Sequence, residues 1–253
     1  MSKEKEQGDK DVAVTEEKPV ARTSGGDGLA AGFDEVDDQK DIIMPRLAVL
    51  QGLSGMVNDG KGAMGDIANS LTKENFGKEV EFIPLFLFKT RVQFEQGRGL
   101  VMLSRDNFTV TFAKDEFEEF IGRDCDEVPG SSWEGKIPPK FHEVFNFPVL
   151  LVGREKEFPL CLSMMRTAAK AAREFISMAR TANEDFFARI YKVTTRVEKG
   201  DKGTYAVPSI ELVGRASDEQ YETALAQYKM IYKRKEDISV DIEEEPLADP
   251  DAV

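Results

Sequence analysis

A stripe of basic residues on a predicted helix is the feature of this sequence best suited to binding a ligand. Residues 166–182 are rich in alanine and contain neither glycine nor proline, which predicts a helix. At about 100° per residue, its polar positions fall within an arc of about 80°, opposite the apolar positions. These polar positions are Arg166, Lys170, Arg173, Ser177 and Arg180. A face of a single charge sign forgoes ion pairs along the helix, which favours contact with phosphates; a merely solvated face is the alternative.

Basic and aromatic residues are also interleaved along a predicted hairpin that follows this helix. Strands are expected over 187–197 and 204–213, joined by a turn. Such a ribbon suits a single nucleic-acid strand, because aromatic rings stack on bases while cations contact phosphates. The candidates are Arg189, Tyr191, Lys192, Arg196, Lys199, Lys202 and Tyr205. The two tyrosines could equally be half-buried residues of a sheet.

The only tryptophan of the chain, Trp133, lies in a Pro/Gly/Ser-rich stretch over 124–142, which predicts a long loop. An exposed indole in a loop can stack on a base, and Lys136 is close enough in sequence to contact a phosphate. The alternative is that Trp133 anchors the loop to the fold. Both interpretations remain open at this point.

Catalytic motifs are poorly represented. The glycine-rich segment 55–62 has the spacing of a nucleotide-binding P-loop as far as Lys61, but Gly62 replaces the hydroxyl residue that would bind magnesium. A nucleotide hydrolase is therefore the least favoured function. One histidine, His142, and two cysteines give no standard zinc spacing, and no G-x-S-x-G nucleophile motif is present. We expect a binding protein with no catalytic residues, no metal and no cofactor.

The elements that position these residues are mainly strands, in apolar or alternating segments bounded by turn residues. The further strand segments are 79–94, 100–104 with 108–113, and 144–153 with 158–164. A short helix is expected over 115–121 and a final helix over 217–232, where Ser217 and Gln220 have the spacing of a capping box. The list predicts a mainly β (α+β) fold, an OB-like bent sheet or small barrel with one packed basic helix and a C-terminal helix.

Charge divides the chain into a predicted domain, 42–235, and two acidic arms that we expect to be disordered. Residues 1–41 hold six basic and twelve acidic residues, and residues 236–253 hold eight acidic residues and no basic one. The whole chain carries −13, yet residues 150–235 hold sixteen basic and eleven acidic residues. The acidic tail could therefore compete with a polyanion for a basic groove, or serve solubility alone. No apolar run approaches the ~20 residues of a membrane span, and no secretory signal is evident, so a cytoplasmic protein with reduced cysteines is expected.

Several segments together resemble a known group of proteins. They are 43–54 (IMPRLAVLQGLS), Gly65–Ile67, the basic helix after Leu162–Ser163, the hairpin ending Gly203–Tyr205, and the acidic end. In this layout, over 42–253, the chain resembles bacteriophage single-stranded DNA-binding proteins with an OB fold, of the T7-like phage type. The resemblance implies sequence-independent binding of single-stranded DNA during phage DNA replication and recombination in a bacterial host, often as a homodimer.

The acidic tail departs from that family's pattern. There the tail usually ends in an aromatic residue that contacts replication proteins, whereas this chain ends in Val253. Competition between tail and DNA remains an expectation, and recruitment of replication proteins is the less supported part. A second function, a protein-interaction or DNA-mimic module whose acidic arms bind a basic partner, also remains open.

Overall fold

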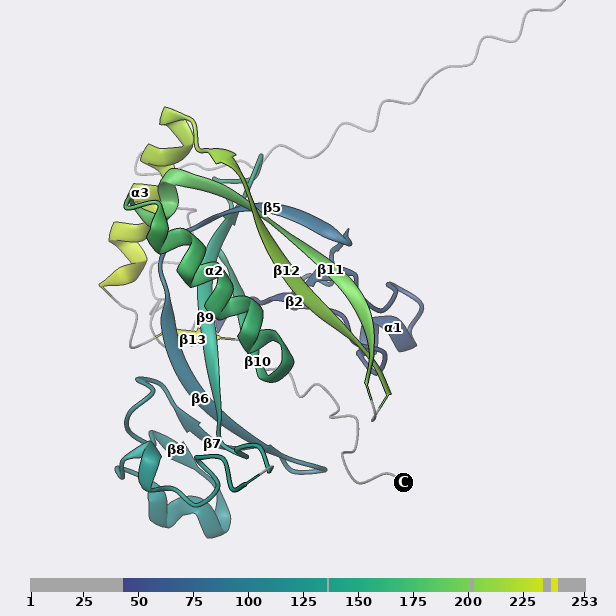
Figure 1. Ribbon diagram of the computed structural model, residues 1–253, viewed down its shortest axis with the longest axis vertical. Coiled ribbons are helices and arrows are strands. Elements are labelled where there is room, and N and C mark those ends of the chain that lie inside the picture. Colours follow the sequence, from purple (N-terminus) through teal and green to yellow (C-terminus); the bar gives the residue numbers. More distant parts are fainter. Residues whose placement is uncertain (1–42, 136, 201–202, 234–237, 241–253) are drawn as a thin grey trace, which may run out of the picture. The chain divides into compact units, whose positions relative to one another are not determined.

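The computed structural model describes residues 43–135, 137–200, 203–233 and 238–240, all within the compact unit Asp38–Val253 (Figure 1). The acidic arm predicted over 1–41 lies outside the described residues. Of the tail predicted over 236–253, only 238–240 are described.

An eight-stranded antiparallel sheet forms the centre of this unit, in the order β12-β11-β5-β9-β6-β7-β8, with β10 pairing to β9. The strands are β5 (Glu79–Pro84), β6 (Phe88–Glu95), β7 (Gly99–Ser104), β8 (Phe112–Ala113), β9 (His142–Leu151), β10 (Leu160–Met165), β11 (Arg189–Gly200) and β12 (Gly203–Arg215). One half of β9 pairs with β6 and the other half with β5, so the sheet bends around β9. The fold is mainly β with an OB-like bent sheet, as the sequence predicted.

A smaller antiparallel sheet packs beside the end of the β11–β12 hairpin. It consists of β2 (Leu47–Val49), β3 (Ile67–Asn69) and β4 (Asn75–Gly77). The short helix α1 (Gly55–Asn58) lies between β2 and β3 in the chain. The side-chain amide of Gln51 joins the two sheets. It donates to the carbonyl oxygen of Ala206 at 3.1 Å and accepts from the amide of Ala206 at 2.9 Å. These two hydrogen bonds occupy part of the outer edge of β12, which otherwise could pair with another strand.

Helices cover both faces of the central sheet. The element η3 (Arg166–Ala168) leads into α2 (Ala169–Thr181), and η4 (Phe186–Ala188) precedes β11; α3 (Asp218–Tyr232) follows β12. Under α2, Phe175 packs with Phe82 and Phe147 in one apolar core. A second core lies on the other face and contains Phe187 and Ile231. There β1 (Ile43–Met44) pairs in parallel with β13 (Ser239–Val240).

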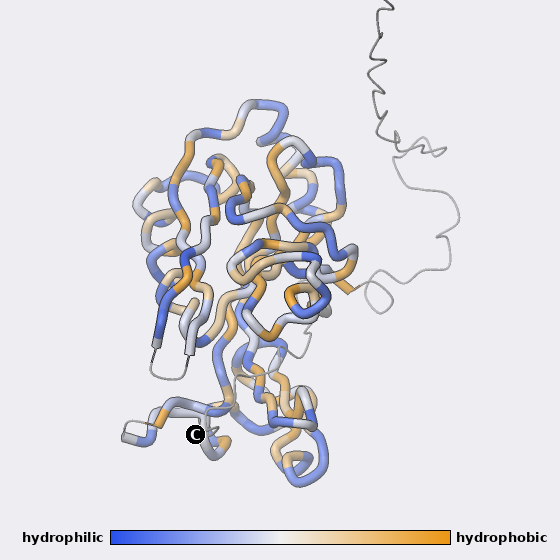
Figure 2. The backbone as a smooth tube through the Cα atoms, turned by 90° about the vertical axis from the view of Figure 1, so that its right-hand side faces the viewer, coloured by the Kyte–Doolittle hydropathy of each residue, from blue (hydrophilic) through white to orange (hydrophobic). Residues whose placement is uncertain are grey.

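Beyond β6, the chain forms a separate lobe, here called the distal lobe, from residues 99–135 and 137–141. It contains β7 and β8, drawn at the bottom of Figure 1, with η1 (Asp115–Phe120) and η2 (Cys125–Glu127). Its own small core includes Met102, Val110 and Phe141. Figure 2 shows that the free end of the β11–β12 hairpin is mainly hydrophilic or neutral.

Most predicted elements are confirmed, with two corrections. The capping box of α3 is present: the Ser217 hydroxyl accepts from the amide of Gln220, and the Gln220 side chain accepts from the amide of Ser217. The continuous stretch predicted over 79–94 is instead two strands, which end and begin on either side of Leu85–Leu87. The turn of the next hairpin is longer than predicted, because β8 begins only at Phe112.

The P-loop interpretation of 55–62 is wrong. The strand before it, β2, pairs antiparallel with β3, and the four-residue helix α1 (Gly55–Asn58) lies within the segment and ends before Lys61. A phosphate-binding P-loop needs a parallel strand and a full helix whose N-terminus faces the phosphates. Lys61 pairs instead with Asp59 at 3.6 Å on an exposed surface.

No helix among the described residues is both long and apolar enough to cross a bilayer.

Candidate nucleic-acid interface

Tyr191 is a core residue. Its side chain is 2% exposed, and its ring centroid lies 4.9 Å from that of Phe175 in α2 and 6.2 Å from that of Phe82 in β5. Burial also raises the pKa of its hydroxyl. A base cannot reach this ring, so the predicted stacking role of Tyr191 is wrong.

The burial of Tyr191 also decides which way its neighbours point. Side chains alternate along a strand, so Lys192 and Arg196 point away from the face that α2 covers. Each is paired with acids there: Lys192 Nζ lies 3.2 Å from Glu211, and Arg196 Nε lies 2.7 Å from Glu198. The predicted basic surface therefore does not continue from the helix onto these two residues.

At the far end of α2, acids also pair with the predicted cations. Arg189 pairs with Glu184 at 3.0 Å, and Arg215 bonds to the same carboxylate. Arg180, exposed at the last turn of α2, shares a shallow surface with Glu184 and Asp185. Three cations face two acids at this end, Glu184 and Asp185, so its net charge is weakly positive and both arginines of the Glu184 pair are already engaged.

At the first turns of α2, by contrast, cations from two elements converge. Lys89 of β6 and Arg173 of α2 both lie over the ring of Phe145, with the ammonium 4.7 Å and the guanidinium 5.4 Å from its centroid. Both also contact one carboxylate: Lys89 Nζ lies 2.8 Å from Glu143 Oε1, and Arg173 Nη2 lies 3.7 Å from Glu143 Oε2. Two cations sharing one acid leave a net positive charge on this surface.

Further cations extend this surface along the helix. Lys170 is exposed. Among the described residues, its one ion pair is with Glu174, one helical turn later, at 3.8 Å. Such a pair is weak and readily exchanged for a phosphate. Arg166 is exposed in η3, which packs against β9 and β12. Burial, and then the positive charge of Arg166, lower the pKa of His142 to about 4, so this imidazole is neutral near pH 7.

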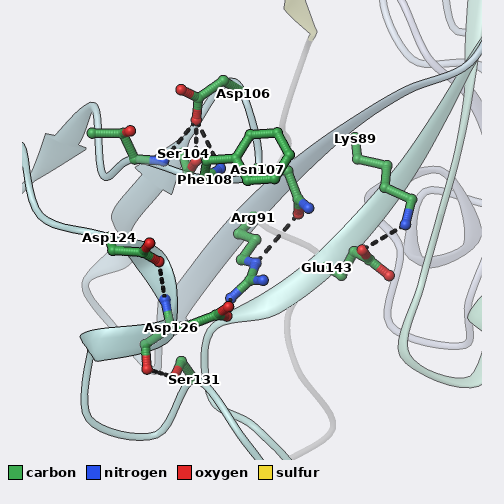
Figure 3. Close-up of polar contacts among 11 residues, drawn as sticks. Lys89, Arg91, Ser104, Asp106, Asn107, Phe108, Asp124, Asp126, Ser131 and Glu143 are labelled. Carbon is green, nitrogen blue, oxygen red and sulfur yellow. Dashed lines mark hydrogen bonds and ion pairs between the residues drawn. The ribbon is translucent and has the colours of Figure 1, made fainter.

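Arg91 joins this surface to the distal lobe. It lies two residues after Lys89 on β6, on the same face of the strand. Its guanidinium donates to Asp126 Oδ1 at 2.7 Å and to Asn107 Oδ1 at 3.3 Å, and its side chain is 16% exposed (Figure 3). We define the basic site as these five cations from β6, η3 and α2: Lys89, Arg91, Arg166, Lys170 and Arg173.

Two aromatic side chains of the distal lobe are largely exposed, Phe108 at 70% and Trp133 at 66%. Trp133 is thus no anchor of its loop, and it remains a candidate for stacking. Phe108 directly follows Asn107, the residue bonded to Arg91. The sequence interpretation missed Phe108, and it also missed Lys89 and Arg91, although cations two residues apart in a strand predict one charged patch on one face.

The remaining predicted residues lie apart from the basic site or outside the residues that the structure describes. Lys199 is exposed near the end of β11, and Tyr205 is half-buried, with its hydroxyl 3.4 Å from Glu198. Lys136 and Lys202 lie outside the described residues. The structure brings together Arg166, Lys170 and Arg173, and it adds Lys89 and Arg91.

Neither thiol has the environment of a nucleophile. Cys161 is fully buried, and burial raises the pKa of its thiol to about 12; burial also raises the pKa of Cys125. Both thiols are therefore protonated near neutral pH. Among the residues that the structure describes, no group of histidine, cysteine and carboxylate side chains is arranged to hold a metal ion.

Comparison with known proteins identifies a phage family. No match to this chain was found among curated proteins or among solved structures. The family model described as Pam3 phage gp34-like protein matches residues 14–237, which is most of the chain. The protein therefore belongs to the Pam3 phage gp34-like family.

Proposed function

We propose that this phage protein binds single-stranded DNA without sequence preference at the basic site and acts in phage DNA replication or recombination in the bacterial cytoplasm. One observation carries the proposal: Lys89 and Arg173, far apart in the sequence, converge on Phe145 and share a single carboxylate. Arg91 shares a face of β6 with Lys89, and Arg166 and Lys170 belong to the same helical stretch as Arg173, which brings the basic site to five cations. No catalytic role is assigned to any of them.

The charges suit a backbone contact that is independent of sequence. Phosphates supply charge but no base identity, so cations that contact them position a strand without selecting its sequence. A phosphate at Lys89 or Arg173 is repelled by Glu143, but two cations face that one acid, so their attraction outweighs the repulsion. If all five cations contact phosphates, the logarithm of the affinity falls with the logarithm of salt concentration with a slope of about −3.5.

A titration with fluorescent oligonucleotides tests this proposal directly. At about 100 mM salt, we expect tighter binding to a single strand than to a duplex of the same length, weakening with salt as given above. Quenching of Trp133, the only tryptophan, gives a label-free second readout. Absence of binding to either probe would reject the proposal. It would favour instead a module that binds a basic protein partner, which the net charge of −13 supports.

Removing part of the acidic tail should tighten binding. The deletion should begin at Asp241, because Val240 pairs with Met44, and Ile238 and Val240 pack against the core under α3. Deleting 241–253 removes six carboxylates. We expect roughly three- to tenfold tighter binding of single-stranded DNA at low salt and a steeper salt dependence, because a competing polyanion is gone.

The matched control for this deletion keeps the tail length and changes the six carboxylates to their amides. It should reproduce the deletion if charge is the cause. Equal affinity of the full chain, the deletion and the amide variant across salt concentrations would show that the tail serves another purpose.

A further inference from the structure

Phe108 is held in solvent by a well-ordered turn. One carboxylate oxygen of Asp106 accepts three hydrogen bonds, from the amides of Phe108 at 2.8 Å and Thr109 at 2.7 Å and from the hydroxyl of Ser104 at 3.0 Å (Figure 3). Asn107 has a φ of 70°, a left-handed conformation that asparagine tolerates. The turn restricts the backbone on which an aromatic ring is displayed 70% exposed.

The electrostatics of the turn match this geometry. Burial tends to raise the pKa of Asp106, but the hydrogen bonds from Thr109, Phe108 and Ser104 outweigh it and leave the pKa below its usual range. The carboxylate is therefore ionised near neutral pH and keeps its three donors. The backbone that carries Phe108 is consequently fixed before any ligand binds, which lowers the entropic cost of binding.

A cation of the basic site contacts the residue that precedes Phe108 in the chain. Arg91 Nε donates to the side chain of Asn107, the residue immediately before Phe108. Arg91 in turn shares one face of β6 with Lys89. Asn107 thus links the turn that carries Phe108 to the cations of β6, and an unpaired nucleotide has the matching parts, a flat base and a phosphate.

We infer that Phe108 is a base-stacking residue for an unpaired nucleotide whose strand is bound by the basic site. This inference rests on the proposed function and adds its preference for unpaired bases. In a duplex the base faces are already stacked on each other, so an aromatic ring gains a partner only from a single strand. Phe108 would therefore contribute to the discrimination between single and double strands, while the cations respond to phosphates in either.

The test compares two probes that carry the same phosphates: an oligothymidylate of about 30 nucleotides and an abasic oligonucleotide of equal length. The wild-type protein should bind oligothymidylate about tenfold more tightly than the abasic strand. Phe108→Ala should weaken binding of oligothymidylate at least fivefold and leave the abasic strand within twofold. Phe108→Tyr, which retains a ring, should restore the preference.

The matched control is Phe158→Ala, which removes another exposed ring, 50% exposed, in a surface groove it shares with Ile43 and Leu71. It should change neither affinity. Equal weakening of both probes by Phe108→Ala, or no change in either, would overturn the stacking role while leaving the basic site intact. Failure of the wild-type protein to bind any strand would instead reject the proposed function, and this inference with it.

Discussion

Changing Lys89 and Arg173 together to glutamate is expected to weaken single-stranded DNA binding at least a hundredfold at about 100 mM salt. Two hydrogen bonds to charged phosphates are lost, each contributing about 1.5–3 kcal/mol. Their loss alone corresponds to a factor of about a hundred or more. The substitutions also place two carboxylates beside Glu143, where the native chain has two cations on that acid. Fluorescence anisotropy of a labelled oligothymidylate measures the change.

The matched control changes Lys192 and Arg196 to glutamate. It alters the net charge of the chain by the same amount, but both residues lie on the face of β11 opposite α2, where acids already pair with them. We expect affinity within about threefold of the wild type, because more distant exposed charges are screened. If the two double variants lose affinity equally, binding depends on overall charge and the basic site has no special role. Thermal unfolding of both variants excludes a loss of fold as the cause.

Hydrophobic patterning predicted most of the fold because it is a local signal. The hairpins and both long helices follow from the segments between turn residues, and the α3 cap follows from Ser217 and Gln220. The division of 79–94 into two strands did not follow, because Leu85, Phe86 and Leu87 continue the apolar pattern. That break depends on β9, which pairs with β5 and β6 along different halves of its length.

The basic helix was identified from its own periodicity, but its extension onto the hairpin was not correct. The alternation of Tyr191 with Lys192 is visible in the sequence and assigns them to opposite faces. The sequence does not show which face α2 covers, since that depends on the packing of Phe175 against Tyr191. With that face known, Lys192 and Arg196 would be excluded from the predicted basic surface.

Partners distant in sequence were the other missing information. Glu143 contacts Arg173 from β9, and Glu184, in the turn after α2, pairs with the distant Arg215 as well as with the nearby Arg189. Such pairs change a cation's availability for phosphate without altering the local pattern. The exposure of Phe108 was equally hidden, because Val110, two residues later, is buried in the core of the distal lobe. Alternation alone would place both on the same face.

Phe175→Ala is expected to lower the free energy of unfolding by about 3–5 kcal/mol, the cost of truncating a buried phenylalanine. The Phe175 ring is the centre of the core under α2: it lies 5.0 Å from Phe147, 5.2 Å from Phe186 and 4.9 Å from Tyr191, between ring centroids. Truncation leaves a cavity against three aromatic rings that cannot readily fill it. Denaturant-induced unfolding measures the loss, and Phe108→Ala, at an exposed ring, provides the control with little change expected.

The same substitution separates the stability of α2 from its charge. Phe175 lies on the buried side of the helix that carries Lys170 and Arg173, so its loss should loosen the basic site without removing a cation. Binding should therefore weaken less than in the Lys89 and Arg173 variant, and saturating oligothymidylate should recover part of the lost stability, because a ligand that binds only the folded state stabilises it. A loss below about 1 kcal/mol would show that the sheet holds α2 through other contacts. A large loss of stability with no recovery by DNA would place the binding surface elsewhere on the chain.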